Sequence, residues 1–207
     1  MKKEERFELV VFPEMSMLSS KIAEILISSS KAKLVKEREI PFPPAIVINK
    51  NEDFEIPKER IYKSKDLIIR IFDATPVYPE EIIKLSKNLA KEIIKETDNL
   101  INIVGRQLVG EGPLRIYLIS NFEKNLYPPF QKPTQFSGIE GMPGLLYYYL
   151  KNTKVKTSVW LVDFYEKDRE KALKEVLTEC AKRINIKVEF NESINANNKK
   201  EPKNYIG

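Results

Sequence analysis

The pattern of apolar and polar positions is clearest in residues 66–105, where it predicts a strand, a helix and a second strand. Residues 67–72 form a nearly unbroken apolar run rich in β-branched side chains, which is typical of a strand covered on both faces. From Pro79 onward, apolar residues recur at three- and four-residue spacing, which predicts a helix with one buried stripe. Residues 100–104 are the second strand, which we expect Gly105 to end. This order predicts a right-handed parallel βαβ unit.

The same reasoning predicts further elements on both sides of this unit. Strands are expected at 7–12, 32–40, 114–120, 157–162 and 186–190, and helices at about 16–28, 143–152 and 168–184. Residues 45–48 and 59–62 are expected to form a small hairpin-like pair. The alternation of strands and helices predicts an α/β fold with a mostly parallel central sheet. We expect one domain over 1–190, followed by a disordered polar tail at 191–207.

The turn after the first strand is where an α/β protein would place a phosphate-binding loop. Here the turn reads Phe12-Pro13-Glu14-Met15-Ser16 and contains no glycine, although such loops need glycine so that backbone N–H groups can approach the anion. The Glu14 carboxylate would also repel a phosphate. We therefore expect no nucleotide site at this turn, and we expect Ser16 to be the N-cap of the following helix.

The residue types present restrict the chemistry that the chain can perform. The sequence has no histidine, which excludes histidine-based acid–base catalysis, Ser–His and Cys–His nucleophiles and imidazole metal ligands. The single cysteine, Cys180, lies on the apolar stripe of a predicted helix, so we expect a buried structural thiol. No catalytic, cofactor or metal site is predicted from these residues.

Charge and hydropathy say more about surroundings than about function. The formal net charge of +5 comes from 35 basic and 30 acidic residues that are mixed along every predicted helix, so the pattern does not favour nucleic acid as a partner. The high charged fraction is also typical of the surface of a thermophile protein. No apolar stretch approaches the roughly 20 residues needed to cross a bilayer. We therefore expect a cytoplasmic protein with no membrane partner.

One region has the composition of a protein-binding surface. Gly141 and Gly144 lie at the start of the helix expected near 143–152, and three consecutive tyrosines cannot all lie on the buried face of that helix, so at least one should be exposed. The long connection at 121–135 contains two further aromatic residues, and loops of this length often carry function. The predicted partner-binding residues are Tyr147, Tyr148, Gly141, Gly144, Tyr127 and Phe130.

The order of these elements resembles that of the proteasome assembly chaperone family (the family of the second assembly chaperone), in its archaeal branch. The resemblance covers about residues 7–190. It rests on the segments 7–12, 44–47, 60–62, 66–70, 75–76, 100–105, 141–146, 157–162 and 168–188.

The resemblance implies a fold and a function. The implied fold is a three-layer αβα sandwich similar to purine nucleoside phosphorylases, without their catalytic residues. The implied function is non-catalytic binding of proteasome α subunits, or of another multisubunit client, by a homo-oligomer. The sequence departs from the family at two points: the turn after the first strand has no glycine, and the terminal Asn204-Tyr205-Ile206-Gly207 lacks the hydrophobic-Tyr-any pattern with which some members dock on the proteasome.

Two other functions are compatible with the sequence. Asp66, Asp73 and Asp163 lie near predicted strand ends, where an ATP-grasp-like ligase would collect carboxylates for Mg²⁺. A small-ligand-binding α/β protein without catalysis is the other alternative. We expect a protein-binding factor rather than an enzyme, because neither a phosphate loop nor a catalytic constellation accompanies these acids.

Overall fold

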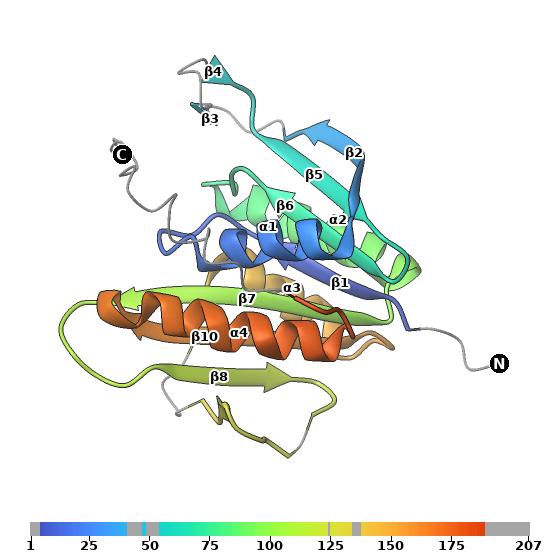
Figure 1. Ribbon diagram of the computed structural model, residues 1–207. Coiled ribbons are helices and arrows are strands. Elements are labelled where there is room, and N and C mark those ends of the chain that lie inside the picture. Colours follow the sequence, from blue (N-terminus) through green and yellow to red (C-terminus); the bar gives the residue numbers. More distant parts are fainter. Residues whose placement is uncertain (1–4, 41–46, 49–53, 124, 134–137, 189–207) are drawn as a thin grey trace.

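The computed structural model describes residues 5–40, 47–48, 54–123, 125–133 and 138–188. They form a three-layer α/β structure in which an eight-stranded mixed sheet lies between two pairs of helices (Figure 1). The expected fold class is confirmed. The segment 189–207, which includes the tail predicted to be disordered, lies outside the described residues.

Four parallel strands form the centre of the sheet: β6 (Leu67–Phe72), β1 (Phe7–Val11), β7 (Asn99–Leu108) and β10 (Lys156–Tyr165), in that order. Leu9 of β1 pairs with Ile69 of β6 on one side and with Ile101 of β7 on the other. The predicted parallel strand–helix–strand unit is therefore confirmed, but β1 lies between its two strands. Gly105 does not end β7, which continues in register with β10 as far as Leu108.

Antiparallel strands extend the sheet at both sides of this centre. On one side, β5 (Lys58–Lys63) joins β6 to the edge strand β2 (Lys33–Glu39). On the other side, β8 (Arg115–Ser120) pairs with β10 and with the short edge strand β9 (Phe130–Gln131).

The hairpin predicted between 45–48 and 59–62 is wrong. β3 (Val47–Ile48) pairs with β4 (Phe54–Glu55) in a separate two-stranded sheet, whereas residues 59–62 belong to β5 of the main sheet. The physical reason is burial: Glu59 and Ile61 of β5 face the covered side of the main sheet, and a two-residue strand could not bury them.

The helices cover the two faces of the sheet in pairs. Helices α1 (Leu18–Ser30) and α4 (Arg169–Arg183), which follows the 3₁₀ turn η1 (Glu166–Asp168), pack on one face, and α2 (Pro79–Glu96) and α3 (Gly141–Leu150) pack on the other (Figure 1). The strands β6, β1 and β7 send apolar side chains to both faces, so each pair of helices has its own hydrophobic cluster.

The final predicted strand at 186–190 is wrong over the residues that can be assessed. After α4, Asn185 adopts a left-handed backbone conformation, and residues 186–188 are not part of any strand. Ile186 and Val188 pack against the cluster under α1 and α4 while Lys187 is exposed. The alternation of residues 186–188 therefore reflects packing beside the helices. These residues could not pair with β1, because β1 already has β6 on one side and β7 on the other.

Candidate functional site

The carboxyl ends of the parallel strands are the place where α/β proteins usually bind ligands. In this chain the Glu14 carboxylate occupies that place. Its oxygens accept hydrogen bonds from the backbone N–H of Ser19, at 2.7 Å, and from the backbone N–H of Gly105. Burial raises the pKa of Glu14, and these hydrogen bonds, together with the Ser19 and Ser16 hydroxyls, offset part of the rise. Glu14 therefore fills the position where a helix N-terminus would hold a phosphate.

The start of α1 differs from the predicted N-cap. Met17 is the N-cap residue, with φ of 53°, and its side chain makes no capping hydrogen bond. The Ser16 hydroxyl instead accepts the N–H of Leu18 at 3.3 Å, and Glu14 takes the N–H of Ser19. The first turn of α1 is thus held by two oxygens that precede the cap residue.

Gly105 allows this loop to pack on the neighbouring strand. A Cβ atom at position 105 would overlap the Ser16 hydroxyl, and would lie 2.9 Å from Leu18 Cβ and 3.0 Å from Glu14 Oε1. A phosphate loop allows close approach with a glycine of its own. Here the glycine belongs to β7, which is adjacent to β1 only in the folded sheet.

The three strand-end carboxylates of the enzyme hypothesis do not form a common site. Asp73 is held by the guanidinium of Arg60, at 2.6 and 2.9 Å, and Asp163 by that of Arg106, also at 2.6 and 2.9 Å. Asp66 precedes β6 and so lies at the opposite end of the sheet. Within the part of the chain that the structure describes, no group of three acidic or cysteine side chains could hold a metal ion.

Exposed apolar side chains stand at the same edge of the sheet as the Glu14 loop. They extend from the loops that follow β6 and β1 and from the end of β7, which are consecutive neighbours in the sheet. Met15 and Val109 are fully exposed, and Val77 is 77% exposed. We call this set the apolar rim: Met15, Met17, Val77, Tyr78, Leu108 and Val109.

The predicted partner-binding tyrosines lie on α3, on the other side of the sheet from α1 and α4. Tyr148 is 60% exposed, which confirms that at least one of the three tyrosines is exposed. Its ring packs edge-on against Tyr149 with 5.6 Å between centroids, and Lys151 Nζ lies 4.7 Å from the ring of Tyr148. Tyr147 is half-buried beside Tyr117, and burial raises its pKa.

The remaining predicted residues differ in accessibility. Tyr127 is 68% exposed, whereas Phe130 is only 8% exposed and packs its ring against Trp160 with 4.9 Å between centroids. Phe130 is thus part of the core, because β9 places it in the sheet. Gly141 is exposed with φ of 65°, and a Cβ at Gly144 would overlap a backbone carbonyl, so both glycines serve the backbone at the start of α3.

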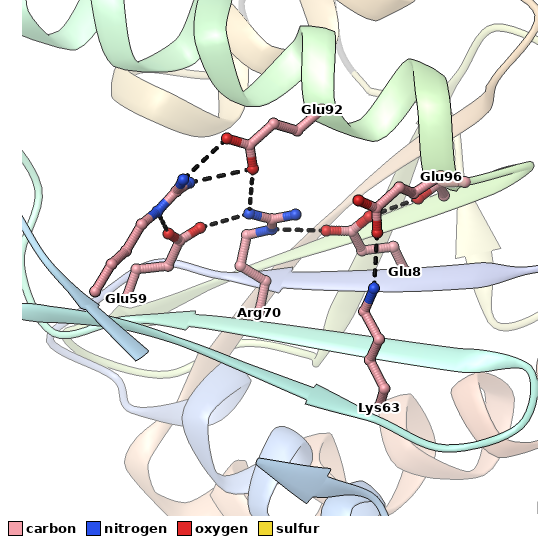
Figure 2. Close-up of polar contacts among 8 residues, drawn as sticks. Glu8, Glu59, Lys63, Arg70, Glu92 and Glu96 are labelled. Atoms are coloured by element: carbon pink, nitrogen blue, oxygen red, sulfur yellow. Dashed lines mark hydrogen bonds and ion pairs between the residues drawn. The ribbon is translucent and has the colours of Figure 1, made fainter. Parts of the chain in front are cut away.

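A buried ion network lies under α2, on the face of the sheet away from α1 (Figure 2). Arg70 of β6 donates from Nε to Glu8 of β1 at 2.8 Å, and from Nη1 to Glu59 of β5 at 2.5 Å and to Glu92 of α2 at 2.9 Å. Arg38 of β2 binds both Glu59 and Glu92. We call these five residues the Arg70 network.

The centre of the Arg70 network is buried. The side chains of Arg70, Glu8 and Glu59 are at most 2% exposed, and the second oxygen of Glu8 accepts the hydroxyl of Thr97 at 2.5 Å. Only Arg38 and Glu92 reach the surface. This arrangement joins four strands to α2 and offers no open face to a substrate.

The chain is similar to known proteins in its three-dimensional structure. No protein-family model matches the chain, and no curated protein matches it. The solved structure of PbaB from Pyrococcus furiosus, described as an archaeal proteasome activator, superimposes with a TM-score of 0.75 and 20% identity, covering 96% of this chain and 90% of that one.

Two further structures have the same fold. PbaA from Pyrococcus furiosus, described as an archaeal homolog of proteasome-assembly chaperone, gives a TM-score of 0.71 and 17% identity, over 96% of this chain and 85% of that one. A proteasome-assembly chaperone homologue from Mycobacterium tuberculosis gives 0.71 and 12%, over 92% and 90%. The chain therefore has the fold of these proteins.

Proposed function

We propose that this chain is a non-catalytic protein-binding factor of the proteasome assembly chaperone family. The observation that carries the proposal is that the usual ligand position at the carboxyl edge of the sheet is occupied by the chain itself. The place where an α/β enzyme would bind its substrate is filled by the chain's own Glu14, and the apolar rim stands at the same edge of the sheet. Several large apolar side chains exposed at one edge of the sheet favour a protein-binding surface there. The shared fold with a proteasome activator and with assembly chaperone homologues supports the same function.

The proposed client is a proteasome α subunit or a related multisubunit complex, bound in the cytoplasm by a homo-oligomer of this chain. The rim includes the unbranched Met15 and Met17 and the aromatic Tyr78, and such side chains adapt to an irregular apolar partner surface. Tyr148 and Tyr127 are proposed as a second contact region, because both are exposed aromatic side chains outside the rim. Membrane and nucleic-acid partners are not proposed. None of the described helices is long and apolar enough to cross a membrane.

The test uses purified α-type proteasome subunits from the same genome, mixed with the full chain and separated by size-exclusion chromatography with light scattering. We expect co-elution, and we expect Met15→Asp combined with Val109→Asp to abolish it, because two charges would be placed in the apolar contact. Ile83→Asp is the matched control, since Ile83 is also exposed and apolar but lies on α2, outside the rim. Light scattering of the chain alone reports its oligomeric state.

The proposal fails if the folded wild-type chain does not bind α subunits, or if the rim variant and the control bind equally well. Titration with ATP–Mg²⁺ in a calorimeter is the complementary experiment. A saturable heat of binding would contradict a non-catalytic role.

A further inference from the structure

The side of α2 that faces away from the sheet carries a row of basic side chains. Lysine recurs at positions 84, 87, 91 and 95, and this spacing of three, four and four residues places the four side chains on one side of the helix. All four are exposed. We call Lys84, Lys87, Lys91 and Lys95 the lysine row. At a helix rise of about 1.5 Å per residue, the row is roughly 16 Å long.

Acidic side chains do not neutralise this row. Within the residues that the structure describes, none of the four lysines forms a side-chain ion pair or hydrogen bond. The two acids in the second half of α2 are engaged elsewhere: Glu92 binds Arg38 and Arg70, and Glu96 binds Lys63 at 2.7 Å (Figure 2). Basic and acidic residues that are mixed along the sequence of α2 are therefore separated in the folded chain, and the row is a strip of uncompensated positive charge.

The lysine row is unfavourable for α2 by itself. Each of its lysines has another lysine three or four residues away, and like charges at these spacings destabilise a helix. In α4, by contrast, Lys171 pairs with Glu175 and Lys182 pairs with Glu179. The Arg70 network and the apolar cluster that includes Leu89 hold α2 on the sheet despite the repulsion. A local rule that is broken without a gain inside the chain indicates a gain from a partner.

The charges at the two ends of the lysine row restrict the class of partner. Glu80 precedes Lys84 by one turn on the same side of the helix, and the negative end of the helix dipole follows Lys95. A nucleic acid is a continuous polyanion that would extend past both ends of the row and be repelled there, whereas a short acidic segment would not. We infer that the lysine row binds an acidic polypeptide segment of a protein partner, with Asp or Glu side chains facing the lysines.

This surface goes beyond the proposed function. The apolar rim ends at Tyr78, before α2 begins, and Glu80 stands between the rim and the lysine row. The partner chemistry also differs, because the rim takes an apolar surface and the row takes carboxylates. The acidic segment therefore binds separately from the client of the rim.

The test is a fluorescence anisotropy titration of the full chain against a labelled peptide of about 12 glutamates, which is long enough to span the row. We expect Lys87→Glu combined with Lys91→Glu to weaken binding at least about tenfold, because two attractions become repulsions. The control combines Lys171→Glu with Lys182→Glu, which changes the net charge equally on α4, where both lysines already pair with an acid. That control should bind the peptide within about threefold of wild type.

The row variant should fold, because each new glutamate stands three or four residues from a remaining lysine, and its melting temperature should not fall below that of wild type. A wild-type chain that does not bind the peptide would overturn the inference, as would equal weakening by the row variant and the control. Tighter binding of a labelled DNA duplex, lost in the row variant, would overturn it in favour of nucleic acid. The measurement needs no α subunit, so its outcome and that of the rim experiment are independent.

Discussion

Replacing Arg70 by methionine should be among the most damaging single changes outside the apolar core. The substitution keeps a long side chain but removes the guanidinium that contacts Glu8, Glu59 and Glu92. Removing one partner of a buried ion pair costs about 3–5 kcal/mol, because the other charge stays buried without compensation. The cost should stay within that range rather than being a sum over three pairs, because Glu8 keeps the Thr97 hydroxyl and Glu59 keeps its pair with Arg38.

The assay is urea unfolding of wild type and Arg70→Met, followed by circular dichroism. We expect the midpoint to fall with little change in the slope, and the melting temperature to fall by about 6–20 °C for a chain of this size. The control is Lys63→Met, which breaks the nearby Lys63–Glu96 pair, whose side chains are 40% and 49% exposed. That variant should lose at most about 1 kcal/mol. A loss for Arg70→Met as small as that of the control would refute the reasoning.

Further predictions concern packing, pH, reactivity and the two aromatic residues. Gly105→Ala should destabilise the chain by about 1–3 kcal/mol in urea unfolding, because the added methyl group overlaps the Glu14 loop, and unchanged stability would mean that the loop is not held there. The pKa of Glu14 is raised in the folded state, so the folded chain binds the extra proton. The unfolding free energy of wild type relative to Glu14→Gln should therefore rise as the pH falls through the folded-state pKa, and level off below the unfolded value of 4.5; a difference independent of pH would contradict this. Cys180 is buried and burial raises its pKa, so a thiol reagent should label it only after unfolding, and rapid labelling of the native chain would show local opening. Phe130→Ala should cost about 3–5 kcal/mol and Tyr148→Ala less than about 1, and equal losses would contradict their assigned burial.

The elements that could be predicted from sequence are those whose apolar periodicity is the same whichever element packs against them. The run at 67–72 and the stripes of α2 and α4 are buried by any covering layer, so their periodicity alone indicates what they are. The pairing of β5 and the fate of residues 186–188 could not be predicted, because each depends on which edge of the sheet is free. An alternating segment beside helices has the same pattern as an edge strand.

Some features of the candidate site could likewise be predicted from the sequence, and others could not. The turn at 12–16 has no glycine of its own, and the glycine that matters for its packing, Gly105, comes from a strand far along the chain. The apolar rim was missed, although Met15, Val77 and Val109 stand in loops where polar turn residues are usual. The Arg70 network also had a sequence signal, since Arg70 and Glu8 each interrupt an apolar strand and a charge in such a strand needs a buried partner.

The central place of β1 has a consequence for the order in which the chain can fold during synthesis. The first strand made, with Leu9, Val10 and Val11 almost fully buried in the end, can pair with β6 once residue 72 has been made, but it has to wait for its other neighbour, β7, until about residue 108. At a translation rate of about 5–20 residues per second, that delay is roughly 5–20 s. Until β7 has been made, one edge of the apolar β1 segment stays unpaired, so the nascent chain exposes an open strand edge before it can complete the centre of its own sheet.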